Sequence, residues 1–252
     1  PGRPLTNSAA ILQNGKVIWH QHKSLLPTYD VFDEDRYFEP AKTVAPFVFN
    51  GRKIALTICE DIWNDEDFWP DRLYRRDPVK ELIAQGADLI LNISASPWHA
   101  GKEQTRLAML QRVARDEKVP LVQVNLVGAN DELVFDGGSV IFDQRGELMV
   151  RGKQFEEDLV LADLDMEAVF RMRLHDPRVR RERLSEEEKG LRRIDLSSKN
   201  HPTQKKPSLP RRDSKPLDRL SETYAALVLG TGDYIRKNGF QIALIGLSGG
   251  IG

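Results

Sequence analysis

Cysteine is scarce in this chain, with one thiol among 252 residues. A single cysteine excludes an internal disulfide framework and a metal centre built on several thiolates. Long apolar runs are also missing, and none approaches the roughly 18 residues that a membrane-spanning helix needs. These absences favour a reduced compartment, and hence a cytoplasmic location without a membrane partner. The remaining thiol, Cys59, is then either buried filler or a nucleophile.

An excess of either charge is absent as well. The chain has 37 basic and 38 acidic residues, so its formal net charge is −1. No overall positive field is available to attract nucleic acid or an anionic membrane. His20 and His22 alternate on one expected strand face, but no third ligand accompanies them. The sequence therefore predicts no nucleic-acid partner and no metal site.

The remaining composition, 40% apolar and 30% charged, is that of an ordinary globular protein. Asn14-Gly15 and Asn50-Gly51 each separate two apolar segments, which is a strong β-hairpin signal. The hairpin strands are expected over residues 8–13, 16–22, 47–49 and 53–59, and further strands over residues 87–93, 119–125, 139–142 and 159–164. Helical patterns cover residues 78–85 and 102–117. Strands with interleaved helices predict an α/β fold for residues 1–165.

The apolar pattern thins after residue 165. Residues 166–216 are rich in Arg, Lys, Ser and Pro, and interleaved acids favour a partly helical linker over a nucleic-acid-binding segment. A regular apolar pattern returns over residues 217–252, which are expected to open a second domain. Its helix should carry one apolar face, formed by Leu217, Leu220, Tyr224, Leu227 and Val228. A buried strand over residues 241–247 should follow and lead into a glycine-rich turn.

Cys59 stands between an expected strand and two carboxylates, Glu60 and Asp61. A buried core cysteine is one interpretation. A thiol at the rim of a sheet, where chemistry usually takes place, is the other. A nucleophilic thiol needs a nearby cation or base, and a lysine whose proton affinity is set by a carboxylate can serve. Lys23 and Glu34 are candidates for that pair, although both could equally be ordinary surface charges.

Several motifs occur together in a fixed order. They are residues 23–27 (KSLLP), 34–38 (EDRYF), 57–63 (TICEDIW), 92–97 (NISASP), 125–132 (NLVGANDE) and 135–139 (FDGGS). With these motifs, roughly residues 5–165 resemble the nitrilase (carbon–nitrogen hydrolase) superfamily, and within it the glutaminase domains of glutamine-dependent NAD synthetases. The resemblance implies a nitrilase-like α-β-β-α sandwich.

The resemblance also implies roles for individual residues. Cys59 would attack the side-chain amide of glutamine, release ammonia and leave a γ-glutamyl thioester for water to hydrolyse. Lys23 and a backbone N–H after Cys59 would stabilise the oxyanion, and Glu34 would orient the lysine. Three further residues stand where similar enzymes hold the α-amino and carboxylate groups of the substrate: Tyr29, Glu60 and Ser96.

One departure from the family pattern concerns the general base. The family's base is a glutamate on a segment upstream of the lysine, and residues 1–22 contain neither Glu nor Asp. We therefore expect this chain to be a fragment without the first strands of the sandwich. Made alone, it should be catalytically silent and prone to aggregate through an uncovered sheet edge.

The glycine-rich segment at residues 246–250 (GLSGG) has three interpretations. The G-x-S-x-G nucleophile elbow requires an acid and a histidine downstream, and only two residues follow. A plain tight turn is the simplest interpretation. The segment also resembles the Ser-Gly-Gly loop of N-type ATP pyrophosphatases, although Gly252 replaces the expected Asp. In that case Ser248, Gly249 and Gly250 would hold the pyrophosphate of ATP with their backbone N–H groups.

This second resemblance implies the start of a Rossmann-like ATP-pyrophosphatase domain. Its reaction would use ATP and Mg²⁺ to amidate deamido-NAD with ammonia from glutamine, in a homo-oligomeric enzyme. A stand-alone amidase and a non-catalytic structural module remain as alternatives.

Overall fold

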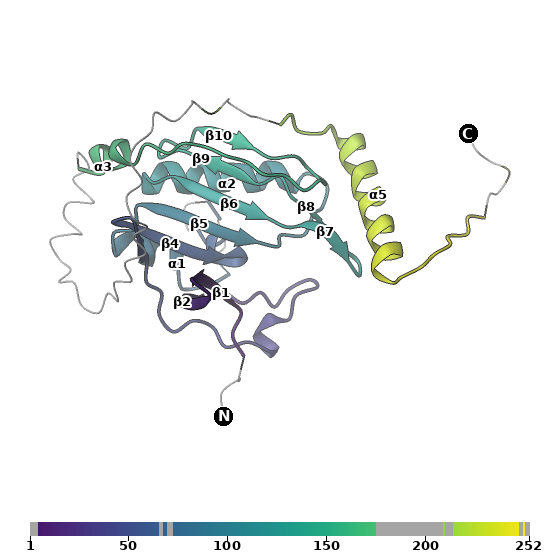
Figure 1. Ribbon diagram of the computed structural model, residues 1–252, viewed down its shortest axis with the longest axis horizontal. Coiled ribbons are helices and arrows are strands. Elements are labelled where there is room, and N and C mark those ends of the chain that lie inside the picture. Colours follow the sequence, from purple (N-terminus) through teal and green to yellow (C-terminus); the bar gives the residue numbers. More distant parts are fainter. Residues whose placement is uncertain are drawn as a thin grey trace.

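The computed structural model describes residues 5–65, 68–69, 73–174, 209, 214–246 and 249. The strands are β1 Ser8–Gln13, β2 Lys16–His22, β3 Phe47–Phe49, β4 Arg52–Ile58, β5 Leu89–Ser94, β6 Leu121–Asn125, β7 Val127–Asn130, β8 Leu133–Asp136, β9 Val140–Phe142 and β10 Leu148–Arg151. The α-helices are α1 Pro78–Ala84, α2 Lys102–Glu117, α3 Met166–Leu174 and α5 Arg219–Lys237, and two 3₁₀ turns are η1 Glu34–Arg36 and η2 Cys59–Ile62. Figure 1 shows how they are arranged.

A six-stranded sheet forms the centre of the fold. Its strand order is β10-β9-β6-β5-β4-β3, and β4, β5 and β6 run parallel to one another. The outer strands β3, β9 and β10 pair antiparallel with their neighbours. Because the three central strands are parallel, their carboxyl ends meet at one edge of the sheet, where α/β proteins commonly bind ligands. The predicted α/β class is confirmed.

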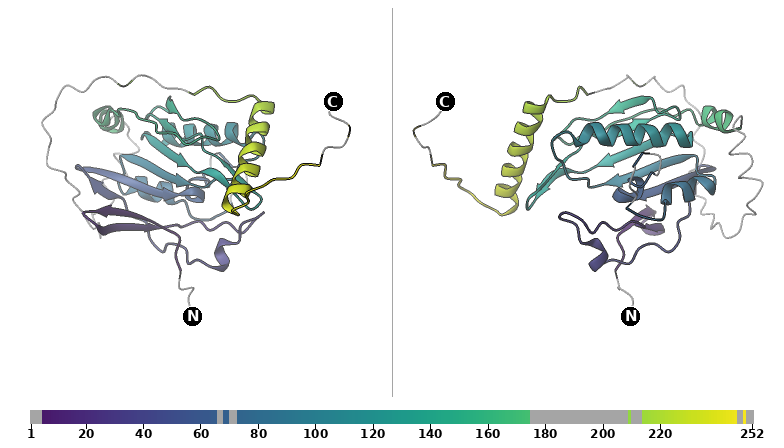
Figure 2. Two further views of the ribbon diagram at one scale, coloured as in Figure 1. Left: turned by 45° about the vertical axis from the view of Figure 1, so that its right-hand side comes forward. Right: turned by 180° about the vertical axis from the view of Figure 1, so that it is seen from behind.

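Helices α1 and α2 cover one face of the sheet, as the right-hand view of Figure 2 shows. Their apolar side chains form the main core with the inward residues of the strands, including Leu82, Ile90, Met109, Leu110 and Leu121. Local signals set the limits of α1: the Asp77 carboxylate accepts a hydrogen bond from the Lys80 N–H at 3.0 Å, and Pro78 occupies the first helical position. Both helices were predicted within two residues of their bounds.

The hairpin β1–β2 packs against the opposite face. Asn14 and Gly15 both adopt positive φ, 51° and 72°, as a tight hairpin turn of mirror-image type requires. Ile11 and Trp19 of this hairpin pack on the second apolar cluster, whose buried members are Phe47, Ile54 and Leu56. The layers are therefore helices, central sheet and hairpin.

Three strands were not predicted, and two predicted strands are wrong. The unpredicted strands are β7, β8 and β10. Each has only four residues, too few to show an alternating pattern of apolar and polar residues. Residues 159–164 form no strand, and neither do residues 241–246, the described part of the expected strand 241–247. Ile242 and Leu244 are 78% and 94% exposed, because no described strand offers them a hydrogen-bonding partner.

Helix α5 is present as predicted, and residues of its apolar face are exposed. Leu220, Tyr224 and Leu227 are exposed, whereas the buried residues of the helix are Glu222, Ala226 and Asp233. α5 docks against the β7–β8 hairpin through polar contacts, and Figure 1 shows it standing beside the ends of these strands. Among the helices in the described ranges, α5 included, none has the length and apolarity to cross a membrane.

Candidate functional site

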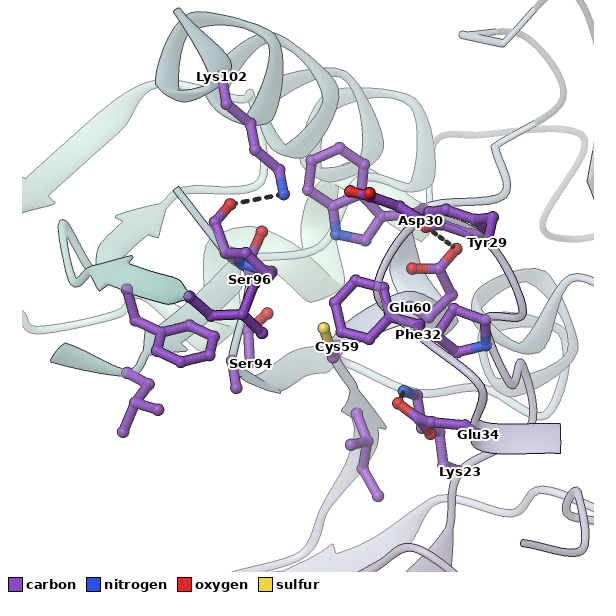
Figure 3. Close-up of a pocket in the computed structure, with 18 of the residues that line it drawn as sticks. Lys23, Tyr29, Asp30, Phe32, Glu34, Cys59, Glu60, Ser94, Ser96 and Lys102 are labelled. Carbon is purple, nitrogen blue, oxygen red and sulfur yellow. Dashed lines mark hydrogen bonds and ion pairs between the residues drawn. The ribbon is translucent and has the colours of Figure 1, made fainter. Parts of the chain in front are cut away.

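A cavity of about 750 Å³ opens at the carboxyl ends of β4 and β5, within the size range of small-molecule sites. It brings together all six residues that the sequence singled out for the glutaminase step: Lys23, Tyr29, Glu34, Cys59, Glu60 and Ser96. They come from segments spread over more than seventy positions of the chain. Figure 3 shows their side chains gathered around the Cys59 sulfur.

Cys59 follows the last residue of β4 and begins the turn η2. Its φ of 44° lies in the left-handed region, which is uncommon for a non-glycine residue and persists only where neighbours enforce it. Asp61 enforces it by accepting the Ile58 N–H at 3.0 Å. The side chain is partly exposed and lines the cavity, so a buried core cysteine is the wrong interpretation.

Lys23 is 2% exposed, and its ammonium group forms an ion pair of 2.6 Å with the Glu34 carboxylate. The backbone that follows Lys23 is held in place, because the N–H groups of Ser24 and Leu25 both donate to the Asp61 carboxylate, at 2.8 and 2.9 Å. A buried ammonium group is tolerated only when it is paired. Ordinary surface charges are therefore the wrong interpretation of Lys23 and Glu34.

Glu60 also lines the cavity and is buried. Its carboxylate accepts hydrogen bonds from the hydroxyl groups of Tyr29 at 2.8 Å and Tyr74 at 3.2 Å. Burial raises the pKa of Glu60, and these two hydrogen bonds oppose the rise. Burial and the adjacent carboxylate also raise the pKa values of Tyr29 and Tyr74, so both hydroxyls stay protonated as donors. The cavity thus holds a carboxylate in a fixed position.

Ser96 is held by a buried polar network. Its backbone N–H donates to Asn125 Oδ1 at 3.0 Å, and Asn125 Nδ2 donates to Asp136 Oδ1 at 3.0 Å. Arg106 binds both oxygens of Asp136, at 2.9 and 2.7 Å. The two partners of this ion pair are each 1% exposed. The network fixes the loop after β5, and with it one side of the cavity.

Sequence reasoning missed Lys102, which lines the cavity, and Tyr74, which donates a hydrogen bond to Glu60. Lys102 Nζ donates to the Pro97 carbonyl at 2.8 Å and lies 5.4 Å from the ring centroid of Trp63. Burial is the main cause that lowers the pKa of Lys102. A lysine at the first position of a helix opposes the helix dipole, and this was the one available signal. Tyr74 lies outside every motif, and no signal in the sequence points to it.

Of the second expected site, only Gly249 lies within the described residues. Gly249 is exposed, and no atom lies within 4 Å of the position its Cβ would take, while Ser248 and Gly250 lie outside the described residues. Within residues 5–174 and 214–246, apart from the gaps in these ranges, no three His, Cys, Asp or Glu residues gather in a way that could hold a metal ion. The expected ATP loop therefore stays a prediction.

The chain is similar in sequence to known proteins over nearly its whole length. A profile of the family "Carbon-nitrogen hydrolase" matches residues 1–173. The glutamine-dependent NAD(+) synthetase of Synechocystis sp. is 41% identical over 99% of this chain and 38% of its own length. That of Thermotoga maritima is 39% identical over 97% of this chain and 40% of its own length. The chain thus spans about two fifths of these relatives.

Solved structures give the same picture. The glutamine-dependent NAD+ synthetase of Acinetobacter baumannii, solved with adenosine diphosphate, superposes with a TM-score of 0.67 at 30% identity. The match covers 93% of this chain and 36% of that one. A carbon–nitrogen hydrolase from Helicobacter pylori superposes with a TM-score of 0.59 at 22% identity, over 69% of this chain and 62% of that one, which supports the fold alone.

Proposed function

The chain belongs to the carbon–nitrogen hydrolase family, and we propose that its cavity hydrolyses the side-chain amide of glutamine. One observation carries the proposal: a partly exposed thiol and a buried lysine–carboxylate pair line the same cavity. A thiol nucleophile needs a cation near the charge that develops during attack, and this pair supplies one in a place that excludes bulk water. A structural module would have no reason to bury an ammonium group beside a thiol.

The proposed reaction proceeds in two stages. Cys59 Sγ attacks the amide carbon, the C–N bond breaks, and ammonia leaves as a γ-glutamyl thioester forms. Water then attacks the thioester, restores the thiol and releases glutamate. Lys23 and the backbone N–H of Glu60 stabilise the oxyanion in both stages, and Glu34 keeps Lys23 in position. A carboxylate base, which the family pattern locates on a segment preceding Lys23, passes the thiol proton to the leaving nitrogen; in the second stage it passes a proton of water to the sulfur.

The charges of the cavity suit an amino acid substrate. The Glu60 carboxylate complements an α-ammonium group, with Tyr29 fixing its orientation. Lys102 and the Ser96 loop stand on another side and complement an α-carboxylate. A simple aliphatic amide would bring no opposite charge to either group, and the interactions that it lacks weaken its binding relative to glutamine. We therefore favour glutamine over unsubstituted amides.

The released ammonia serves a second reaction in the proposed function. Relatives named glutamine-dependent NAD(+) synthetases match nearly all of this chain, which supports ATP-dependent amidation of deamido-NAD with Mg²⁺. In this proposal, residues 1–165 form the glutaminase domain, 166–216 a linker and 217–252 the start of the synthetase domain. Ser248, Gly249 and Gly250 would contact ATP. A homo-oligomeric state and a cytoplasmic location complete the proposal.

Separating the two reactions tests it. In a polypeptide that spans the full length of the relatives, Cys59→Ala should abolish NAD synthesis from glutamine and leave synthesis from ammonia intact. The matched variant Cys59→Ser replaces the thiol with a hydroxyl group of similar size. It should be equally inactive with glutamine, because an alcohol is a far weaker nucleophile at neutral pH. Loss of both activities in a folded variant would contradict two separate sites. Hydrolysis of simple amides as fast as glutamine would favour a general amidase.

A further inference from the structure

Helix α5 lies outside residues 1–173, which the family profile matches, yet it reaches the wall of the cavity. Its Glu222 carboxylate accepts a hydrogen bond of 2.6 Å from the indole N–H of Trp98, a cavity-lining residue. We propose that Glu222 is a positioning residue for the glutaminase reaction, and that the docking of α5 thereby sets the affinity of the cavity for glutamine. The inference rests on the proposed function.

The backbone of Trp98 is held independently of α5. Its N–H donates to the Val134 carbonyl of β8 at 2.7 Å, and the preceding carbonyl of Pro97 accepts from Lys102. The indole ring meets Phe155 edge-on, with 5.9 Å between ring centroids. An edge-to-face contact permits several ring positions, whereas a short hydrogen bond to a carboxylate selects one. Glu222 therefore decides where the indole stands.

Glu222 is buried, and its position in the helix does not by itself require this. The residue is 7% exposed, although glutamate is rarely buried so far. It lies in the first turn of α5, where the helix dipole favours an acidic side chain, and Asp218 caps the same turn. Those local preferences would be satisfied equally well by an exposed glutamate. Its burial against Trp98 is a tertiary feature, and a charge-assisted hydrogen bond offsets the cost of removing it from water.

A second pair of contacts anchors the far end of α5. The Asp233 carboxylate accepts the Ala129 N–H at 2.8 Å, and Lys237 Nζ donates to the Ala129 carbonyl at 2.6 Å. Gly128 permits this approach, because a Cβ there would lie 3.2 Å from Asp233 Oδ2. Both views in Figure 2 show α5 beside the same end of the sheet. With both ends of the helix attached, a movement of α5 must displace Trp98 or break its hydrogen bond.

Kinetics of five variants test the proposal in a polypeptide that spans the relatives' length. Glu222→Ala should raise KM for glutamine about tenfold, the cost of one charge-assisted hydrogen bond, while kcat changes by less than about threefold. Glu222→Gln retains a carbonyl acceptor and should recover most of the affinity. Trp98→Phe should raise KM about as much as Glu222→Ala does. The KM of the double variant should be no higher than that of the single variant with the higher KM. The control Tyr224→Ala alters an exposed residue of α5 and should leave KM unchanged.

A spectroscopic measurement accompanies the kinetics. An indole ¹⁵N–¹H spectrum contains one signal for each tryptophan, and the signal that is lost in Trp98→Phe is that of Trp98. This signal should lie far downfield in the wild type and move upfield in Glu222→Ala. Synthesis from ammonia shows that each variant is folded.

The possible outcomes separate the two claims. A wild type that releases no ammonia from glutamine refutes the proposed function, and the inference is lost with it. An active wild type whose KM is unaffected by Glu222→Ala, or whose Trp98 signal does not move, refutes the inference alone. Additive effects of Glu222→Ala and Trp98→Phe would also refute it, because residues that act through one contact are not additive.

Discussion

The ion pair between Arg106 and Asp136 should be among the most sensitive positions in the protein. Both side chains are 1% exposed, and two hydrogen bonds of 2.9 and 2.7 Å join them. Asp136→Asn removes the negative charge and leaves the guanidinium buried without a counter-charge. Breaking a buried pair in this way costs about 3–5 kcal/mol, a large part of the roughly 5–15 kcal/mol that stabilises a typical domain.

The same substitution also loosens the cavity. Asp136 Oδ1 accepts from Asn125 Nδ2, and Asn125 in turn holds the Ser96 N–H. We therefore expect Asp136→Asn to weaken glutamine binding even at temperatures where the fold persists. Removing the buried cation as well, in Arg106→Met/Asp136→Asn, should restore at least about 1 kcal/mol relative to the sum of the single substitutions.

Urea unfolding measures these changes as shifts of the midpoint at constant slope. The matched control is Asp116→Asn at an exposed pair, where Arg115 and Asp116 are 57% and 37% exposed. Such a pair contributes less than about 1 kcal/mol. A loss below about 1 kcal/mol for Asp136→Asn, or strict additivity in the double variant, would refute the view that this pair supports the site.

Three further predictions follow from the site and the core. Lys23→Ala should slow ammonia release from glutamine at least about a hundredfold. Lys23→Arg should be similarly slow, because a planar guanidinium does not fit the place of an ammonium group. A rate within a few-fold of wild type for Lys23→Ala would remove Lys23 from the mechanism. Burial raises the pKa of Glu117 to about 7, so its protonated form favours the folded state. This contribution is complete below the unfolded pKa and is lost as pH rises through about 7. Glu117→Gln should therefore exceed the wild type in stability by up to about 3 kcal/mol at pH 8 and lose that advantage at pH 4.5. Equal urea midpoints for variant and wild type at both pH values would contradict this prediction. Gly128→Ala at φ 136° should cost about 1–3 kcal/mol and release α5, seen as faster amide exchange in α5, and an unchanged exchange pattern would contradict the tight approach of Asp233.

Local signals explain how much of the fold the sequence could predict. The Asn-Gly turns, the Pro78 start of α1 and the apolar face of α2 depend on neighbouring residues, and these predictions are confirmed. Whether residues 241–246 form a strand depends on a partner strand elsewhere, and no described strand pairs with them. Which face of α5 is buried depends in the same way on distant segments: Glu222 binds the indole of Trp98 and Asp233 binds the Ala129 N–H, while Leu220 and Leu227 stay exposed.

The candidate site divides in the same way. Motifs that resemble the family located Lys23, Glu34 and Cys59, and the structure places them at one cavity. Lys102 and Glu222 have no motif of their own, since their places depend on contacts between segments far apart in the chain. For Glu222 and Trp98 the separation is 124 residues.

Labelling of the Cys59 thiol, in a polypeptide that spans the relatives' length, tests the central claim most directly, and Cys59 is the one cysteine among these 252 residues. An electrophilic glutamine analogue should add one mass increment to the wild type, located at Cys59, and free glutamine should protect against it. Lys23→Ala should react far more slowly, and Cys59→Ala not at all. Labelling at the same rate in Lys23→Ala and wild type, or modification that glutamine does not prevent, would contradict a glutamine-specific nucleophile activated in this cavity.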